Sequence, residues 1–336
     1  MVIFYCAAGA GIGLGHFNRC LKISKALEKN YPMIHSCFVA PSPAMKKNNM
    51  RFLEKWEDVL PGQVFVLDRV TTQCIEDPTA LCQLLKEISA RQHKIVFIDG
   101  VGSHCFLSKQ DNLPEIDLAV IPYAGAQPIA HARVKNWLMG SYYALIDEIY
   151  QSAQKRPQPL HCRKVLVTLG GADPKNLTML VLKALSQLDV ICRIIVGPFF
   201  SKESINQIKR FASKKPSWEV VFSPPTLFEY YDWADLVVNS IGVSSYEVMA
   251  MGKPSLQISS SMAHAEHGDY LDKHQLICHI GYFGGVAQNE LSTKIASLLE
   301  NQQQREMLSN NAYNAINSKG VLHVANAIGQ LDQSIA

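Results

Sequence analysis

The chain has 336 residues, of which 48% are hydrophobic and 18% charged, and its formal net charge is +3. This length exceeds one ordinary compact core, because domains usually hold roughly 100 to 200 residues, so we expect two domains. The apolar content excludes a disordered chain, and the small net charge without long basic runs gives no basis for nucleic-acid binding. An anionic small molecule remains a candidate ligand.

The cysteines and the first residues of the chain indicate the cellular compartment in which we expect the protein. The nine cysteines stand singly between Cys6 and Cys278, with no C-x-x-C pair and no zinc-ligand spacing. That pattern is typical of reduced, buried thiols, so we predict a cytoplasmic protein. The chain starts directly in an apolar strand pattern, without a basic region or a long apolar core, so we expect no signal peptide. No segment is apolar for long enough to span a bilayer.

The first half alternates short β-branched or aromatic runs with longer helical patterns, which predicts a parallel sheet built from strand-helix-strand units. The clearest predicted helix covers residues 17–29, where apolar and lysine side chains fall on largely opposite faces. The predicted strands of this half are residues 2–6, 35–40, 63–67, 94–99 and 118–121.

Between residues 46 and 56, basic side chains alternate with apolar ones, which predicts a surface helix that packs on the sheet. A weak peripheral contact with a membrane is the alternative interpretation of this face. The residues concerned are Lys46, Lys47, Met50, Arg51, Phe52, Leu53, Lys55 and Trp56.

A polar, proline-rich stretch at residues 154–161 fits neither periodicity and lies near the middle of the chain, so we predict a linker there. It separates an N-terminal domain, 1–153, from a C-terminal domain, 162–336. The last helix is a candidate to return to the N-terminal domain. The predicted elements of the second half are strands 164–169, 192–196, 219–222, 236–239 and 255–258, and helices 291–300, 304–317 and 321–331.

The first motif is a glycine-rich turn, Gly9-Ala-Gly-Ile-Gly-Leu-Gly15-His16, between the first strand and the first helix. Glycines let a ligand approach the backbone, and a helix N-terminus offers free N–H groups, so Gly13 and Gly15 are candidate ligand contacts. The dinucleotide fingerprint G-x-G-x-x-G fails, because Leu14 or His16 falls on its last position. The second strand also lacks the acidic residue that a nicotinamide dehydrogenase needs, and no P-loop sequence is present.

His16 falls where the first helix begins. The positive end of the helix dipole disfavours imidazolium and keeps the ring neutral, which suits a general base. The alternative is a histidine that serves only as a polar helix start.

The second motif opens the second half, with Gly170 and Gly171 between a strand and a helix. Asp173 as N-cap and Pro174 as first helical residue explain the helix start without a ligand. Capping does not explain two glycines, which fit a turn at the carboxyl end of a parallel strand, where open α/β sheets bind ligands.

The third motif runs from residue 237 to residue 254, with a strand ending near Asn239 and a helix that Ser244 or Ser245 caps. Hydroxyls and N–H groups at a helix start form a good diphosphate site. Glu247, in the first turn, is placed to bind ribose hydroxyls, although a first-turn glutamate is also favourable with the dipole alone.

Histidines and acidic residues cluster at residues 264–269, His-Ala-Glu-His-Gly-Asp. A metal site made of His264, His267 and Asp269 is conceivable, but we expect a polar ligand-binding loop with no metal. Glu266 and His267 are therefore candidate ligand contacts.

These three motifs, in this order, resemble the GT-B glycosyltransferases of the MurG type, and more closely the UDP-sugar hydrolase of the pseudaminic acid pathway and the related spore-coat polysaccharide proteins. The resemblance covers most of the chain. The matching stretches are Ile-Gly-Leu-Gly-His-Phe-Asn-Arg at 12–19, Leu-Gly-Gly-Ala-Asp-Pro-Lys-Asn-Leu-Thr at 169–178, Ser-Ser-Tyr-Glu at 244–247, Gly-Lys-Pro at 252–254, Gly140 and Tyr-Ala-Leu-Ile at 143–146.

The resemblance implies two Rossmann-like domains whose parallel sheets face a cleft. A UDP-sugar would be held mainly by the C-terminal domain, with ribose at Glu247 and phosphates near Ser244 and Ser245. His16 would reach across from the N-terminal domain as the base. No cofactor beyond the UDP-sugar substrate is implied.

The first strand departs from the hydrolase pattern, because Tyr5 and Ala7 stand where that pattern has an Arg and an Asp. We therefore predict a UDP-sugar dependent glycosyltransferase of surface polysaccharide or glycan biosynthesis, acting on a sugar or glycolipid acceptor. The alternative is a UDP-sugar hydrolase, in which water is the acceptor. A non-enzymatic sensor of sugar nucleotides is a third hypothesis, which absence of UDP release would favour.

Overall fold

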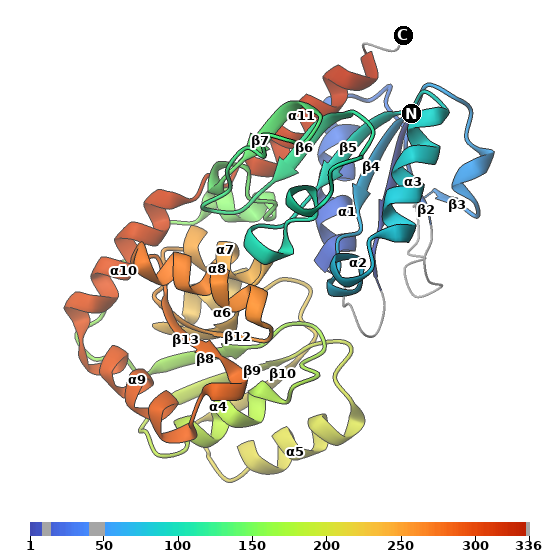
Figure 1. The fold of residues 1–336 in the computed structure, drawn as a ribbon. Helices are drawn as coiled ribbons and strands as arrows, with labels where there is room; N and C mark the ends of the chain where they lie inside the picture. The colour runs from blue at the N-terminus through green and yellow to red at the C-terminus, as the bar shows by residue number, and fades with distance from the viewer. Residues whose placement is uncertain (9–14, 40–50, 334–336) are drawn as a thin grey trace. The chain divides into compact units, whose positions relative to one another are not determined.

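The computed structural model describes residues 1–8, 15–39 and 51–333, which fall into two compact units (Figure 1). Unit 1 comprises Met1–Asp147 and Asn317–Ala336, and unit 2 comprises Glu148–Ile316. Residues 154–161, predicted to link two domains, lie within unit 2. Each unit is a parallel sheet flanked by helices, so the predicted fold class is confirmed, whereas the cleft between the sheets stays a prediction.

Unit 1 contains a seven-stranded sheet in the order β3-β2-β1-β4-β5-β6-β7, with parallel pairing throughout. The predicted strands of this half match five of these to within two residues. The sequence did not indicate the two edge strands, because β3 is short and β7 carries the polar residues Lys135 and Asn136. The strands are β1 (Val2–Cys6), β2 (Ser36–Val39), β3 (Phe52–Leu53), β4 (Val64–Asp68), β5 (Lys94–Ile98), β6 (Ile116–Ile121) and β7 (Val134–Met139).

Both faces of this sheet are buried, which explains the nearly continuous apolar runs of its central strands. Phe4 packs on one face against α1 (Gly15–Asn30) and α11 (Gly320–Gln333). Ile3 points to the opposite face, which α3 (Thr79–Ala90) covers after the short helix α2 (Thr72–Glu76). Figure 1 shows α11 beside α1, although these helices come from opposite ends of the chain.

The surface helix predicted for residues 46–56 is wrong over its described part, and residues 46–50 lie outside the described residues. Phe52 and Leu53 form β3 beside β2, and Trp56 begins a 3₁₀ turn, Trp56–Asp58, with its ring buried. Pairing with β2 and burial of the indole outweigh the helical pattern of charges. The described part of this segment therefore does not form the predicted helix, and the weak membrane contact stays a prediction.

Unit 2 contains a six-stranded parallel sheet in the order β10-β9-β8-β11-β12-β13. The predicted strands match five of the six, and β13 was not predicted. The strands are β8 (Lys164–Thr168), β9 (Ile191–Val196), β10 (Trp218–Phe222), β11 (Leu236–Ser240), β12 (Ser255–Ser259) and β13 (Cys278–Tyr282). The helices are α4 (Leu177–Leu185), α5 (Lys202–Ala212), α6 (Phe228–Trp233), α7 (Val243–Ala250), α8 (Met262–Lys273), α9 (Gln288–Glu300) and α10 (Gln302–Ala315).

The two faces of the sheet in unit 2 differ in chemistry. One face is an apolar core in which Val238 and Ile258 meet side chains of α4, α5 and α9. The alternate residues Asn239 and Gln257, both fully buried, point to the other face, toward the side where Figure 1 shows α6, α7 and α8. The polar face is the one that carries the third motif.

Gly320, the first residue of α11, allows the packing of α11 within unit 1 to be tested. A Cβ added there would lie 2.3 Å from the carbonyl oxygen of Ala144, so Gly320→Ala forces the backbone to shift. Overpacking of this kind costs about 1–3 kcal/mol, which urea denaturation should register as a lower free energy of unfolding.

Gly285→Ala is the matched control, because an added Cβ there meets nothing within 4 Å. Its free energy of unfolding should stay within about 0.5 kcal/mol of the unaltered protein. Equal stability of the two variants would contradict the close approach of α11 to residue 144.

Candidate functional site

The carboxyl ends of β1 and β4 form the point in unit 1 where the strand order reverses, because β2 lies on one side of β1 and β4 on the other. Ligands of open α/β sheets bind in the crevice outside such a point. His16 is the second residue of α1, which follows β1, and Asp68 is the last residue of β4. Strand order thus brings together two residues that are 52 positions apart.

His16 and Asp68 form a hydrogen-bonded dyad. The Nδ1 atom of His16 lies 2.6 Å from Oδ1 of Asp68, and this close approach to a carboxylate requires Nδ1 to carry the proton. Arg19 Nη2 lies 2.9 Å from the same Nδ1, but it donates to Oδ1 of Asp68 at 2.8 Å instead. The Nε2 atom is then the proton acceptor of the ring, and it has no hydrogen-bond partner among the described residues.

The two members of the dyad differ in solvent exposure. The Asp68 side chain is 1% exposed, whereas that of His16 is 18% exposed. A buried carboxylate that orients a partly exposed imidazole is the arrangement in which the imidazole accepts a proton and the carboxylate stabilises the resulting cation. His16 therefore has the geometry of a general base.

Arg19 and Tyr123 hold the carboxylate in place. Arg19 Nε donates to Oδ2 of Asp68 at 2.9 Å, which makes the ion pair bidentate, and Arg19 Nη1 donates to the Tyr123 hydroxyl. Burial works to raise the pKa of Asp68, but the charge of Arg19 and the hydrogen bond to His16 outweigh it and lower the pKa to about 2. Asp68 is thus ionised at neutral pH despite its burial.

The sequence analysis missed Asp68, Arg19 and Tyr123. Asp68 ends an apolar strand, Val-Phe-Val-Leu-Asp, and a carboxylate at that position is the signal that was available. Arg19 lies one helical turn after His16, on the same face of α1. Gly13, a predicted contact, lies outside the described residues, and Gly15 is the exposed first residue of α1.

Unit 2 has a reversal point of its own, between β8 and β11, and the two predicted glycines lie there. Gly170 has a φ of +90°, which favours glycine, and it lies beside Ser240 at the end of β11. A Cβ on Gly197, after β9, would lie 2.5 Å from the carbonyl oxygen of Gly171. Bare backbone from the ends of β8 and β9 therefore lines this edge, beside the Ser240 side chain.

The start of α4 differs from its prediction. The helix begins at Leu177, so Pro174 is not its first residue. Asn176 is the N-cap, so the prediction of Asp173 at that position is wrong, although the Asp173 carboxylate accepts hydrogen bonds of 2.8 Å from the N–H groups of Leu177 and Thr178. The three intervening residues lengthen the turn after Gly171.

Helix α7 begins at Val243, so neither Ser244 nor Ser245 is its cap, and Gly242 occupies that position. The Ser245 hydroxyl is fully buried, accepts from the N–H of Gly242 and donates to Oε1 of Gln257 at 2.7 Å. Ser245 is therefore used inside the protein, whereas Ser244 is half-buried in the first turn. The first N–H groups of α7 have no partner within the helix, as at any helix start.

Glu247 lies in the second turn of α7 and not in the first, because the helix starts at residue 243. Its carboxylate is half-buried, and Oε2 accepts a hydrogen bond of 3.5 Å from the buried Tyr231 hydroxyl. This contact fixes the position of a carboxylate on the helix that follows the reversal point.

Residues 264–269 form part of α8 and not the predicted loop, because Ser261 caps a helix there by accepting from the N–H of His264. His267 is buried with Nε2 3.0 Å from the Tyr246 hydroxyl, and burial, together with nearby histidines, lowers its pKa to about 4. Glu266 lies on the exposed side of α8. No group of three or more His, Cys, Asp or Glu among the described residues is arranged to hold a metal ion.

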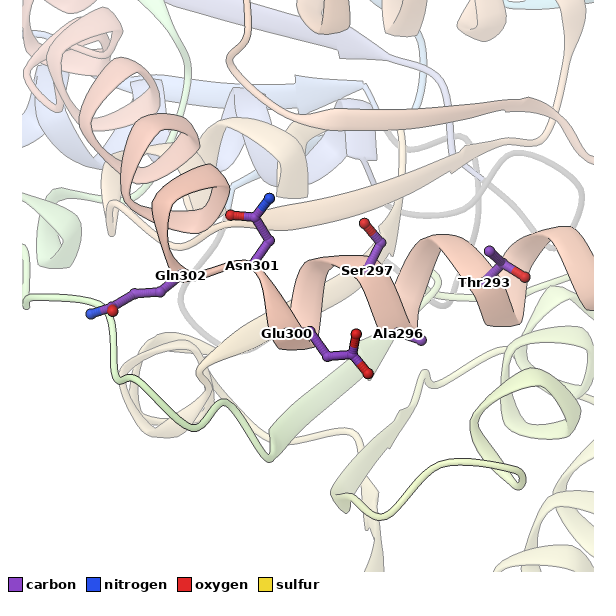
Figure 2. A pocket seen from close by; sticks show the side chains of 6 residues that line it. All are labelled: Thr293, Ala296, Ser297, Glu300, Asn301 and Gln302. Carbon is purple, nitrogen blue, oxygen red and sulfur yellow. The ribbon is translucent and has the colours of Figure 1, made fainter.

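A surface hollow of about 560 Å³ lies elsewhere in unit 2, along the end of α9 and the start of α10 (Figure 2). Its lining contains one ionisable residue, Glu300, and no nucleophile with a base beside it. This hollow therefore offers no catalytic chemistry. Its lining residues are Thr293, Ala296, Ser297, Glu300, Asn301 and Gln302.

The strand orders and the structural neighbours define the fold as GT-B, two Rossmann-like domains in one chain. A variant of Os79 from O. sativa in complex with UDP matches with a TM-score of 0.66, 13% identity and full coverage of both chains. Spinosyn rhamnosyltransferase SpnG matches at 0.62, 13% identity, 97% of this chain and 100% of its own. MurG of Acinetobacter baumannii matches at 0.61, 12% identity, 98% of this chain and 99% of its own.

Two proteins are similar to this chain in sequence as well. The spore coat polysaccharide biosynthesis protein SpsG of Bacillus subtilis is 24% identical over 197 residues, 55% of this chain and 56% of its own. The uncharacterised protein MJ1062 of Methanocaldococcus jannaschii is 22% identical over 293 residues, 78% of this chain and 56% of its own. The chain spans little more than half the length of both relatives. No protein-family model matches it.

The buried ion pair of Asp68 predicts how stability depends on pH. Its folded-state pKa of about 2 lies below the usual value of 3.8 for an aspartate, so its stabilising effect is present above pH 4 and is lost as pH falls toward 2. A shift of this size corresponds to about 2 kcal/mol. Asp68→Asn should unfold more easily than the unaltered protein, by an amount that shrinks by about this value between pH 4 and pH 2.

Urea denaturation at several pH values measures this difference. Asp111→Asn, which alters an exposed carboxylate, should leave the unfolding curves almost unchanged. A stability difference for Asp68→Asn that is constant across this pH range would refute the assignment.

Proposed function

We propose that this protein is a UDP-sugar dependent glycosyltransferase of polysaccharide or glycan biosynthesis, in which His16 is the general base and Asp68 orients it. The observation that carries the proposal is the dyad at the reversal point of unit 1, with Nε2 of His16 left as a proton acceptor. The fold, which the UDP complex of Os79 shares, and the similarity to a polysaccharide biosynthesis protein support it.

The donor is assigned to unit 2. The glycine turn at Gly170 and Gly171 and the start of α7, with Ser244, lie at the reversal point and offer unpaired N–H groups to a diphosphate. Glu247 accepts hydrogen bonds from the ribose hydroxyls. Glu266 and His267 are secondary to these, since His267 already contacts Tyr246.

The proposed reaction is a single displacement. Nε2 of His16 takes the proton of an acceptor hydroxyl, and that oxygen bonds to the anomeric carbon while the carbon–oxygen bond to the diphosphate breaks. UDP leaves with the electron pair of that bond, and the Asp68 carboxylate stabilises the imidazolium. Preorganised N–H groups stabilise the leaving diphosphate, so the proposal assigns no cofactor.

Hydrolysis of the UDP-sugar is the second candidate, because the same dyad activates a water molecule equally well. Tyr5 and Ala7 disfavour it, since the hydrolase pattern has an Arg and an Asp at these positions. The acceptor of the proposed transfer is a sugar or a glycolipid. None of the helices in the described part of the chain has the length and apolarity to cross a bilayer, and all nine cysteines are free thiols. Free thiols are in keeping with the proposed cytoplasmic site of action.

Nucleotide release from a panel of UDP-, GDP- and CMP-sugars tests the function. A transferase should release UDP slowly until an acceptor extract is added, whereas a hydrolase should release UDP and free sugar with water alone. No release with any donor, with or without acceptor, would overturn the proposal in favour of a sensor.

The base is tested by His16→Ala, which should lower kcat by roughly 10²- to 10⁴-fold, the usual contribution of a general base. Asp68→Asn should lower it in the same direction, because the ring loses the partner that fixes its tautomer. His161→Ala alters an exposed histidine and should keep normal turnover. Normal turnover of His16→Ala would remove His16 from the mechanism.

The donor site is tested by Glu247→Ala, which should weaken UDP binding by roughly 10- to 100-fold, as expected for a lost hydrogen bond to a charged group. Isothermal titration calorimetry measures the Kd. Glu229→Ala changes an exposed residue of α6 and should bind UDP as the unaltered protein does. Equal Kd values for both variants would rule out the role of Glu247.

A further inference from the structure

Arg69 follows Asp68 directly at the carboxyl end of β4, and its guanidinium lies over the ring of Tyr5 on β1. The central carbon of the guanidinium is 4.1 Å from the ring centroid, a close cation–π contact. The Arg69 side chain is half-buried, and its backbone carbonyl accepts from the Cys74 thiol. Both its main chain and its side chain are therefore held in place.

The charge of Arg69 is not compensated by a carboxylate. Asp68 is engaged by Arg19 and His16, and Arg69 has no ion pair with any described residue. The internal stretches outside the described residues, 9–14 and 40–50, contain no Asp or Glu in their sequence. Arg69 is thus a positive charge at the carboxyl end of β4, next in sequence to Asp68, that contacts Tyr5 on the face of the sheet opposite α1 and forms no ion pair with a described residue.

The other buried carboxylate at this edge of the sheet does not serve Arg69 either. Asp99, directly after β5, accepts from the backbone N–H groups of Gly100, Phe106 and Leu107 at 2.7 to 2.9 Å. These bonds use the carboxylate to hold the loop that follows β5. Neither Asp68 nor Asp99 therefore pairs with Arg69, which leaves its guanidinium available to an anionic ligand.

An arginine that lies over an aromatic ring is well suited to binding an anion. The guanidinium lies over the ring, and its planar set of N–H donors matches the geometry of carboxylate and phosphate oxygens. Because the ring restricts the side chain beforehand, less conformational entropy is lost on binding. Tyr5 is also one of the two positions where the chain departs from the hydrolase pattern, and the stacking gives that departure a role.

We propose that Arg69, supported by Tyr5, binds an anionic oxygen group, a carboxylate or a phosphate, on the acceptor molecule. This inference rests on the proposed function, since His16 in the same unit acts on the acceptor and the donor is assigned to unit 2. The chain accordingly selects acidic acceptors, either a sugar carboxylate or a lipid-linked phosphate.

Modification of arginine by phenylglyoxal, followed residue by residue with mass spectrometry, tests the site on the full-length protein. Glucuronate and farnesyl phosphate in detergent micelles are the two anionic probes, and glucose and farnesol are their neutral counterparts. At least one anionic probe should slow modification of Arg69 by about 10-fold or more, as expected for a charge-assisted hydrogen bond. The probe that protects identifies the source of the anion.

Arg133, an exposed arginine of unit 1, is the internal control and should be modified at the same rate with every additive. Equal modification rates of Arg69 with all four additives would overturn the proposal. Protection by the neutral probes to the same extent as by the anionic ones would overturn it as well.

Tyr5 is tested by a matched pair of variants. Tyr5→Leu removes the ring and should raise the half-protecting concentration of the anion about 3- to 10-fold, whereas Tyr5→Phe keeps the ring and should not. Equal shifts in both variants would contradict the supporting role. Arg69→Gln should lower kcat/KM for an acidic acceptor by roughly 10- to 100-fold, and Arg133→Gln should leave it unchanged.

The two proposals fail separately, because protection of Arg69 requires no turnover. Absence of nucleotide release together with anion-specific protection would remove the proposed function and keep the anion site. Turnover that depends on His16 together with an unprotected Arg69 would remove the anion site and keep the function.

Discussion

The buried negative charge of Asp68 is the constraint on which the organisation of unit 1 depends. A carboxylate without access to water is tolerated only when hydrogen-bonded and paired, and here the bidentate contact with Arg19 supplies both. Because Arg19 lies on α1 and also contacts Tyr123, this one charge joins the first helix to the ends of two separate strands. The rotation of α1, and with it the direction of the His16 ring, follows from that pairing.

In unit 2, hydrogen bonds between polar side chains position the start of α7. The face of the sheet under α7 is polar, and the Ser245 hydroxyl is part of that layer, joined to Gln257, which in turn donates to Ser255. Ser245, which the sequence predicted as a possible cap of α7, thus points into the protein and anchors the start of the helix. Ser244 stays half-buried at the helix start, where its hydroxyl donates to the carbonyl of Ser240. The two units share a reversal of strand order but differ in what they offer there, fixed side chains in one and mainly backbone in the other.

Local patterns predicted most of the strands and the residues that neighbour them in sequence, namely His16 and the glycines at 170 and 171. Asp68 was missed, because it joins the site only through the long-range pairing of β1 with β4, and the one local sign was a carboxylate at the end of an apolar strand. Residues 52–56 show the opposite kind of error. Their pattern of charges predicted a helix, whereas strand pairing and the burial of Trp56 determine the structure. The cluster at 264–269 was misjudged because its polarity suggested a loop, whereas Ser261 starts a helix there.

The position of α11 has a consequence for the order in which the molecule acquires its structure. Val324 and Ile328 of this helix belong to the same apolar core as Phe4 and Ile23, and the terminal amino group pairs with Asp332 at 2.8 Å. Unit 1 therefore lacks part of its core until α11 has been synthesised, whereas the continuous unit 2 has all of its segments before that point. During synthesis unit 1 is completed after unit 2, and until then a strip of its apolar surface stays exposed to chaperones and to other nascent chains.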